Sequence, residues 1–313
     1  MHKGKIVIVG DGFVGSTIAF SVLKSGLFAE IMLIDLDRDK AEGDALDMMH
    51  GISFVNTASV YAGDYSDCKD ADVVVITAGA AQAKGETRHD LLIKNASIFK
   101  NITTELIKYI NDDTKILVVT NPVDVLTYVT LKISGMDKSC VIGSGTVLDT
   151  SRLKYELSKH TGISPKNIHS YILGEHGDSE IAAFSTTSIA GMTVSEFCGN
   201  CKKCSGTQIN QILDNVKYSA YDIINKKGAT YYAVALAVER ILSAIIDDEN
   251  SILTVSSLLT GEYGLNDVAL SAPSVVNRRG VDRIIEIPLS DSEREGLFHS
   301  ADTLKQLLKE LKL

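Results

Sequence analysis

Short apolar runs alternate with longer amphipathic stretches through the first 145 residues of the chain. The amphipathic stretches at 13–25 and 90–110 predict helices. The runs that predict strands are KIVIVG (5–10), EIMLID (30–35), DVVVITAG (72–79), KILVVTN (115–121) and CVIGSG (140–145). Such runs, separated by helices, are typical of βαβ units. We therefore predict an α/β fold, with a doubly wound parallel sheet that is covered by helices on both faces.

The pattern changes after about residue 150, where longer helical periods surround one strand-like block, SILTVSSLL (251–259). We therefore predict two domains, a parallel-sheet domain at 1–145 and a mixed α+β domain at 146–313. Near the end of the chain, Ser290 and Glu293 have capping-box spacing, which predicts the start of an amphipathic helix docked on the core. Its apolar face is expected to carry Leu297, Ala301, Leu304, Leu308 and Leu311.

Composition narrows the class of protein. The chain has 313 residues, 45% apolar and 23% charged, which is ordinary for a globular protein and long for one hydrophobic core. A net charge of −9 argues against nucleic acid or an anionic membrane as partner. No apolar run approaches the ~20 residues that span a bilayer, and the N-terminus does not resemble a signal peptide. We therefore expect a cytoplasmic location.

Five cysteines are present, an odd number that favours reduced thiols. Cys198, Cys201 and Cys204 follow a C-x2-C-x2-C spacing, which raises the alternative of a metal site. Such a site needs a fourth ligand and usually a second pair of ligands. We interpret the segment, which contains Lys and Gly, as a surface loop with incidental thiols, and we predict no metal.

A glycine-rich segment, GDGFVGS, directly follows the first predicted strand. Gly10, Gly12 and Gly15 have G-x-G-x-x-G spacing, and Asp35 ends the second strand, twenty residues after Gly15. This constellation is typical of a Rossmann dinucleotide site, where the helix N-terminus binds the pyrophosphate. Asp35 would bind the ribose hydroxyls and repel a 2′-phosphate, an effect to which Asp37 adds. The first domain is therefore predicted to bind NAD rather than NADP.

Catalytic groups in such a sheet gather beyond the carboxyl ends of the strands. Oxidation of an alcohol by a nicotinamide also requires a group that takes the hydroxyl proton, and histidine suits this at neutral pH. His176, in YILGEHGDSE, is the candidate, and Asp149 is the candidate carboxylate that orients its ring. Arg152 has the planar fork that binds a carboxylate. Taken singly, each has a plainer interpretation: His176 a solvated loop residue, Arg152 a surface ion pair with Glu156.

Six motifs together resemble, in order, those of L-lactate dehydrogenases in the lactate/malate dehydrogenase family. They are GDGFVGS, DVVVITAGAAQAKGETR, VVTNPVDV, GSGTVLDTSR, YILGEHGDSE and KGATYYAVA. The resemblance covers nearly the whole chain. It implies reversible hydride transfer between NADH and pyruvate at the end of fermentation, by a homotetramer, with L-lactate as the product.

The resemblance also implies residue roles. His176 would transfer the proton, Asp149 would orient it, and Arg152 would hold the substrate carboxylate. Arg88, on a mobile loop with Gly79 and Gly85 as hinges, would polarise the carbonyl. The other implied substrate contacts are Gln82, Asn121 and Thr230. The implied cofactor contacts are Gly10, Gly12, Val14, Gly15, Asp35, Lys40, Gly79, Ala80, Asn121 and Ser144. The bond before Pro122 is expected to be cis.

Gln82 stands where malate dehydrogenases of this family have an arginine that pairs with a second carboxylate. A neutral amide leaves that charge unpaired, so pyruvate is expected to be preferred over oxaloacetate. The loop departs from the commonest family pattern at Ala83 and Lys84, with no proline. A malate dehydrogenase, a dehydrogenase of branched 2-hydroxy acids and a non-catalytic dinucleotide-binding protein remain alternatives.

Many bacterial family members are activated by fructose 1,6-bisphosphate through an arginine and a histidine at a subunit interface. His169 matches the histidine, whereas Lys154 occupies the place of the arginine. Lysine keeps the charge but loses the bidentate fork. The resemblance therefore leaves this activation open.

Overall fold

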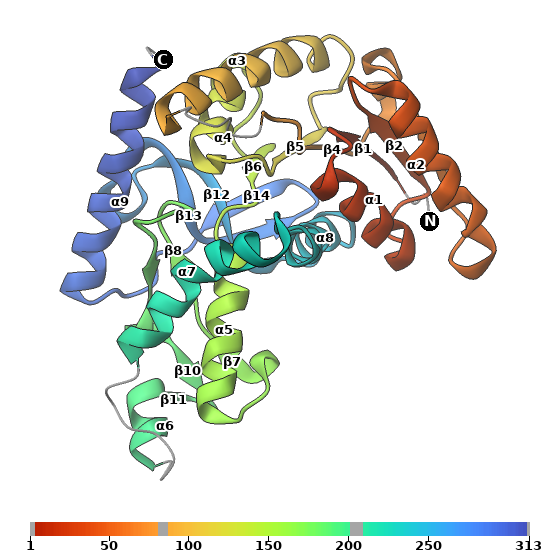
Figure 1. The fold of residues 1–313 in the computed structure, drawn as a ribbon. Coiled ribbons are helices and arrows are strands. Elements are labelled where there is room, and N and C mark those ends of the chain that lie inside the picture. The colour runs from red at the N-terminus through yellow and green to blue at the C-terminus, as the bar shows by residue number, and fades with distance from the viewer. Residues whose placement is uncertain (1–3, 81–86, 201–208, 312–313) are drawn as a thin grey trace.

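The computed structural model of the chain describes residues 4–80, 87–200 and 209–311. Nine strands form one sheet in the order β14-β13-β12-β6-β5-β4-β1-β2-β3 (Figure 1). The strands of its parallel part are β1 (Lys5–Val9), β2 (Glu30–Ile34), β3 (Ser59–Ala62), β4 (Val73–Ile76), β5 (Lys115–Val118) and β6 (Val141–Gly143). The five strands expected from the apolar runs are confirmed, and β3 was not foreseen.

Helices cover both faces of the sheet. Successive residues of a strand point to opposite faces, and in these strands the residues on both faces are apolar. In β1, Ile6 and Ile8 belong to one hydrophobic core and Val7 to the other. The first core packs the sheet against α1 (Phe13–Ser25), α2 (Arg38–His50) and α8 (Tyr232–Ile246). The second packs it against α3 (Arg88–Leu106), α4 (Val123–Ser134) and α9 (Asp291–Glu310). The doubly wound architecture is therefore confirmed.

The sheet continues beyond the first 145 residues. The strands β12 (Ser251–Thr260), β13 (Asn266–Asn277) and β14 (Gly280–Ile284) pair antiparallel with one another. Strand β12 joins the parallel part, with Ser256 opposite Gly143. Helix α8, also from the second half, packs on α1, where Ser21 donates a hydrogen bond to Glu239. The two-domain division at 145 remains a prediction, and both halves share one sheet.

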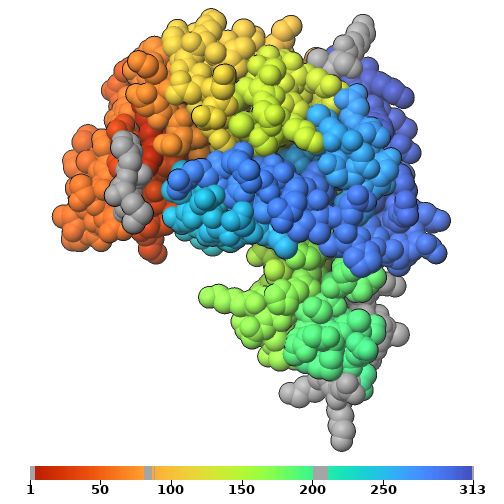
Figure 2. Space-filling view, turned by 180° about the vertical axis from the view of Figure 1, so that it is seen from behind, coloured from red at the N-terminus to blue at the C-terminus, as the bar shows by residue number. Residues whose placement is uncertain are grey.

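A small lobe projects from the main body (Figures 1 and 2). Its elements include β7 (Ile168–His169), β10 (Ser188–Ile189), β11 (Met192–Thr193) and α6 (Val194–Asn200). Helices α5 (Val147–Thr161) and α7 (Ile209–Lys227) connect it to the body, and the short hairpin of β8 (Ile172–Leu173) and β9 (Ile181–Ala182) lies beside them. The lobe has its own apolar core, which includes Leu153, Leu157, Ile168, Ile189 and Val216.

The C-terminal helix begins as its capping box predicted. The Ser290 amide donates to Glu293 Oε2 at 2.8 Å, and the Glu293 amide donates to Ser290 Oγ at 3.3 Å. Its buried face carries Leu297, Ala301, Leu304 and Leu308. Within the described ranges, no helix is both long and apolar enough to cross a membrane.

The three cysteines that the structure describes, Cys68, Cys140 and Cys198, are free thiols. Cys198 lies in α6 close to α5, with its Sγ 3.6 Å from His160 Nε2. Cys201 and Cys204 lie outside the described residues.

Candidate active site

The turn between β1 and α1 requires glycine at two positions. Gly10 has φ +102°, and a Cβ there would overlap the main chain of Ala78. A Cβ at Gly15 would overlap the carbonyl oxygen of Gly10, since α1 packs closely on the turn. The first and third glycines of the motif therefore allow this strand-turn-helix geometry.

Gly12 has a different environment. A Cβ at this position would meet no atom within 4 Å, so the requirement for glycine does not come from the protein itself. Gly12 is the N-cap of α1, and no side chain caps this helix end. The free N–H groups and the helix dipole favour an anion there. The open space at Gly12 and the uncapped helix together fit the pyrophosphate of NAD.

Asp35 directly follows β2 beside this turn, close to the place predicted. Its Oδ2 accepts a hydrogen bond from the Asp11 amide at 2.5 Å, and its Oδ1 accepts one from the Asp37 amide at 2.9 Å. Lys40 lies on the same side, with Nζ 3.1 Å from Asp11 Oδ2 and 2.7 Å from Asp44 Oδ2. Burial raises the pKa of Asp11 to about 6, although Lys40 opposes the shift. Sequence analysis missed Asp11, whose position inside the glycine motif was its only signal.

A cavity of about 260 Å³ opens beyond the carboxyl ends of β4, β5 and β6. The predicted residues that line it are Val14, Asn121, Ser144, Arg152, His176 and Thr230. The bond between Asn121 and Pro122 is cis, as expected. The apolar wall of the cavity consists of residues that sequence analysis did not single out. They are Ala220 and Ile224 of α7 and Val234 and Ala237 of α8. The amphipathic pattern of these helices indicated burial without indicating a cavity.

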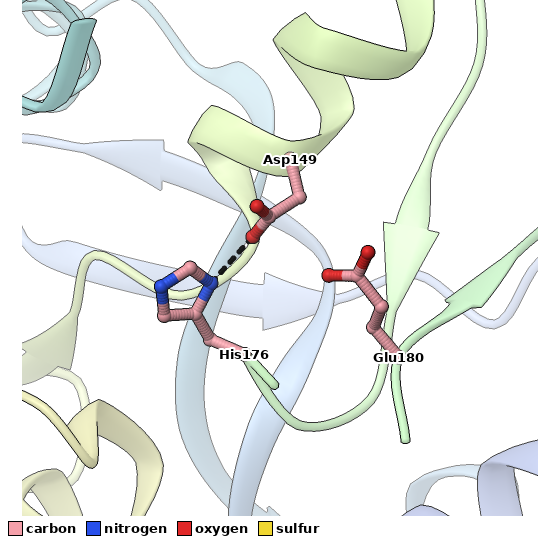
Figure 3. A group of neighbouring side chains, drawn as sticks. All are labelled: Asp149, His176 and Glu180. Atoms are coloured by element: carbon pink, nitrogen blue, oxygen red, sulfur yellow. Dashed lines mark hydrogen bonds and ion pairs between the residues drawn. The ribbon is translucent and has the colours of Figure 1, made fainter. Parts of the chain in front are cut away.

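His176, Asp149 and Arg152 form a connected group at this cavity. His176 Nδ1 lies 2.5 Å from Asp149 Oδ2 (Figure 3), and Arg152 Nη1 donates to Asp149 Oδ1 at 2.7 Å. Arg152 therefore pairs with Asp149 rather than with Glu156, which binds Lys159 instead. The Asp149 carboxylate is buried, while the His176 side chain is 23% exposed. The ring thus presents its other nitrogen for proton transfer.

The charges around His176 favour its protonated form. Burial alone would lower the pKa of His176, but the negative charge and hydrogen bond of Asp149 raise it to about 9. Burial would raise the pKa of Asp149, and the charges of His176 and Arg152 outweigh burial and lower it. Asp149 therefore carries the negative charge and His176 the proton, as an acid that protonates a carbonyl requires.

Buried polar side chains that sequence analysis missed hold the loops of the site. Asp124 Oδ2 accepts from the His176 amide at 2.7 Å, and Ser300 Oγ accepts from the Glu175 amide at 2.6 Å. Asn95 Oδ1 accepts from the Ala80 amide at 2.8 Å, and Asn95 Nδ2 donates to the Asn121 carbonyl at 3.1 Å. These contacts join segments that are distant in the chain, so no local pattern could have revealed them.

The remaining predicted substrate and cofactor residues belong to the segment after β4. Gly79 and Ala80 follow β4, where a Cβ on Gly79 would approach Thr120 Cγ2 to 2.5 Å. Gln82, with Ala83, Lys84 and Gly85, lies outside the described residues. Arg88 begins α3, after the N-cap Thr87, and its side chain is likewise outside the description.

Neither of the two predicted effector residues, Lys154 and His169, lines the catalytic cavity. Lys154 lines a second cavity of about 480 Å³, together with Lys166 and Arg240. His169 lies on β7 opposite Ser188, and it does not line this cavity as the described residues form it.

Comparison with known proteins gives matches along the whole chain. A family model of the NAD-binding domain of lactate/malate dehydrogenases matches residues 4–143, and a model of their α/β C-terminal domain matches residues 146–312. The chain is 57% identical over 305 residues to L-lactate dehydrogenase 1 of Clostridium acetobutylicum, with 97% of each chain covered. It is 54% identical over 309 residues to the L-lactate dehydrogenase of Acetivibrio thermocellus, with 98% of this chain and 97% of that one covered.

Two solved structures share the fold over the full length of both chains. One is a lactate dehydrogenase enzyme from a Medee basin deep-sea metagenome library, with 42% identity and a TM-score of 0.97. The other is the minor L-lactate dehydrogenase of Enterococcus mundtii in a ligand-bound form, with 39% identity and a TM-score of 0.97.

Proposed function

Because the chain belongs to the lactate/malate dehydrogenase family, we propose that it is an NAD-dependent enzyme that reduces pyruvate to L-lactate and catalyses the reverse oxidation. The observation that carries this conclusion is the charged group of His176, Asp149 and Arg152 at a cavity that Val14, within the glycine-rich segment, also lines. An acid and a carboxylate-binding cation thus lie beside the nucleotide turn.

His176 acts as the proton donor in this proposal. When bound, the nicotinamide of NADH supplies a hydride, which leaves the carbonyl oxygen in need of a proton. The His176 imidazolium gives that proton from the ring nitrogen that does not contact Asp149. Asp149 keeps a proton on Nδ1, so the other ring nitrogen is the one that gives and takes the proton, and its negative charge stabilises the charged ring. In lactate oxidation the neutral imidazole takes the proton back.

Arg152 binds the carboxylate of the substrate. One of its nitrogens donates to Asp149, which leaves the rest of the guanidinium free to form a two-bonded contact with a carboxylate. Asn121 and Thr230, from two further segments of the cavity wall, complete the proposed substrate contacts. Holding the carboxylate in this way fixes the carbonyl next to His176.

Gln82 and Arg88 complete the proposal by resemblance. Gln82 selects an acid without a second carboxylate, and Arg88 stabilises the negative charge that develops on the carbonyl oxygen. The test is NADH oxidation with pyruvate, oxaloacetate and branched 2-oxo acids. Pyruvate should have the largest kcat/KM, and Gln82→Arg should move the preference toward oxaloacetate. If the protein turns over none of these acids, the alternative of a non-catalytic dinucleotide-binding protein is favoured.

Regulation by a sugar bisphosphate belongs to the same proposal. Three cationic side chains, Lys154, Lys166 and Arg240, line the second cavity, and this supports phosphate binding there. Burial lowers the pKa of Lys154, so an anion that pairs with it would also stabilise its charge. Titration of fructose 1,6-bisphosphate should lower the KM for pyruvate, and Lys154→Ala should weaken the effect. An unchanged KM would remove this part of the proposal.

The assembly and location of the protein are a further part of the proposal, supported by family membership. We propose a homotetramer in the cytoplasm, and the buried free thiols Cys68 and Cys140 are consistent with a reducing compartment. Analytical ultracentrifugation with and without the sugar bisphosphate tests the assembly. A monomer under both conditions would contradict it.

A further inference from the structure

Glu180 places a second acidic side chain beside the catalytic pair. It precedes β9 and is 4% exposed, with its carboxyl group turned toward Asp149 and His176 (Figure 3). One carboxyl oxygen of Glu180, one of Asp149 and one ring nitrogen of His176 all lie within 4.8 Å of one another. Glu180 Oε1 is fully buried and has no hydrogen-bond partner in the described part of the chain. A buried carboxylate without a partner is costly, whereas a neutral acid is much less so.

The charges that face Glu180 come from two helices and its own loop. Asp149 and Arg152 belong to α5, Lys217 to α7 and His176 to the loop, while Asp124 of α4 lies behind the His176 amide. Burial raises the pKa of Glu180 to about 8, and the negative charge of Asp149 adds to the shift. His176, Lys217 and Arg152 oppose it.

We propose that Glu180 is a positioning residue for the proton of His176: it is neutral at neutral pH and, once ionised in alkaline solution, holds the proton on the imidazole. This inference rests on the proposed function, because it assigns Glu180 to the same proton transfer. The physical reason is mutual stabilisation of two opposite charges at short range in a buried site. A negative Glu180 makes the imidazolium harder to deprotonate. The pH range in which His176 can protonate pyruvate therefore extends upward.

The chain offers a matched control in the same loop. Glu175 is a half-buried carboxyl side chain that accepts a hydrogen bond from Ser179. Glu175→Gln therefore makes the same chemical change as Glu180→Gln, one residue before His176, without removing the group that faces the ring. Both amides keep the size of the original side chain.

The kinetic test follows kcat/KM for pyruvate against pH at saturating NADH. In wild type its alkaline limb reports the loss of the His176 proton. Glu180→Gln should move this limb to lower pH by about one pH unit, and the acid limb of lactate oxidation should move by the same amount. Glu175→Gln should keep the wild-type limb. A Glu180→Gln limb at the wild-type position, or an equal movement in Glu175→Gln, would overturn the proposal.

A second measurement does not depend on turnover or on the stability of the variant. Infrared difference spectra of the wild-type NADH complex should show the carbonyl stretch of a protonated carboxyl group at pH 7, and this band should disappear in alkaline solution. Asp11 and Asp124 each have a pKa raised by burial to about 6, so their bands disappear at lower pH. Absence of a band that titrates above neutral pH would overturn the proposal. If instead the proposed function is wrong, the protein would not reduce pyruvate, but this band would still be present at pH 7 and titrate above neutral pH.

Discussion

The glycine-rich turn and the catalytic cavity lie at the same edge of one sheet, yet they are built in opposite ways. The glycines of the turn all lie in residues 10–15, and their requirements are steric: Gly15 avoids the Gly10 carbonyl, and Gly10 avoids the main chain of Ala78. The cavity instead collects Asn121, Arg152, His176 and Thr230 from four separate segments. A site made by main-chain geometry is thus local, whereas a site made by interacting charges depends on the packing of distant elements.

The two regions also differ in what stabilises them. Space at Gly12 and the uncapped start of α1, whose main-chain N–H groups have no side-chain cap, characterise the turn. In the cavity, Asp149 carries a charge that both His176 and Arg152 contact. Substitutions in the turn should therefore act on cofactor affinity or stability, and substitutions in the cavity on the chemical step.

The largest expected effect is the loss of the proton donor. His176→Asn removes the acid but keeps a polar side chain of similar size, so kcat for pyruvate reduction should fall by about 10²–10⁴-fold. The Kd of NADH, measured by fluorescence titration, should change far less. A comparable loss of NADH affinity would mean that His176 belongs to the nucleotide region rather than to the chemistry.

A smaller loss is expected for the carboxylate clamp. Arg152→Lys keeps the charge but loses the planar fork, so kcat/KM for pyruvate should fall by about a hundredfold through poor orientation. Steady-state kinetics at saturating NADH measure this, and kcat should fall as well as kcat/KM, because a poorly oriented carbonyl reacts slowly. A variant with wild-type kcat/KM would show that point charge alone binds the substrate.

Two glycine variants separate folding from binding inside the turn. Gly15→Ala should lower the free energy of unfolding by about 1–3 kcal/mol, because the added methyl overlaps the Gly10 carbonyl. Gly12→Ala should leave that free energy near wild type and raise the Kd of NADH about tenfold, a change of ~1.4 kcal/mol. Urea unfolding and NADH titration measure the two quantities. Stability loss in both variants alike would remove the distinction.

The charged cavity should also contribute a pH dependence of stability that the turn does not. The pKa of His176 rises from 6.5 to about 9 on folding, so the folded state holds this proton more tightly. The resulting stabilisation is fully present below pH 6.5 and is lost as the pH rises through about 9. Between these values the free energy of unfolding should fall in wild type by about 3 kcal/mol more than in Asp149→Asn. Gly12→Ala, which leaves the His176–Asp149 pair intact, serves as control and should follow wild type.

The fold could be predicted where its elements follow from local pattern. The apolar runs identified five strands, and the Ser290–Glu293 spacing located the start of α9, because hydrophobic periodicity and helix capping depend on neighbouring residues. The pairing of Ser256 with Gly143 could not be predicted in the same way. It joins strands more than a hundred residues apart and merges the two halves into one sheet.

The candidate site likewise contains residues that the sequence could predict and residues that it could not. His176, Asp149 and Arg152 could be proposed from their chemistry and from the resemblance of the surrounding motifs. The supporting residues Asp124 and Asn95 act through hydrogen bonds to the main chain of distant loops, and their own segments carry no sign of it. Glu180 follows His176 by only four residues, but its effect depends on burial that the sequence does not reveal.

The sequence by itself determined the turn, the nature of the cofactor and the residue types of the chemistry, because each of these depends on a short segment and on the intrinsic properties of its side chains. The tertiary structure alone decided that Arg152 pairs with Asp149, that Asp124 holds the His176 amide and that Glu180 faces the catalytic pair. The physical reason is that hydrogen bonding and charge stabilisation act over a few ångströms. Only packing brings groups from different elements within that range and removes the water that would otherwise screen them.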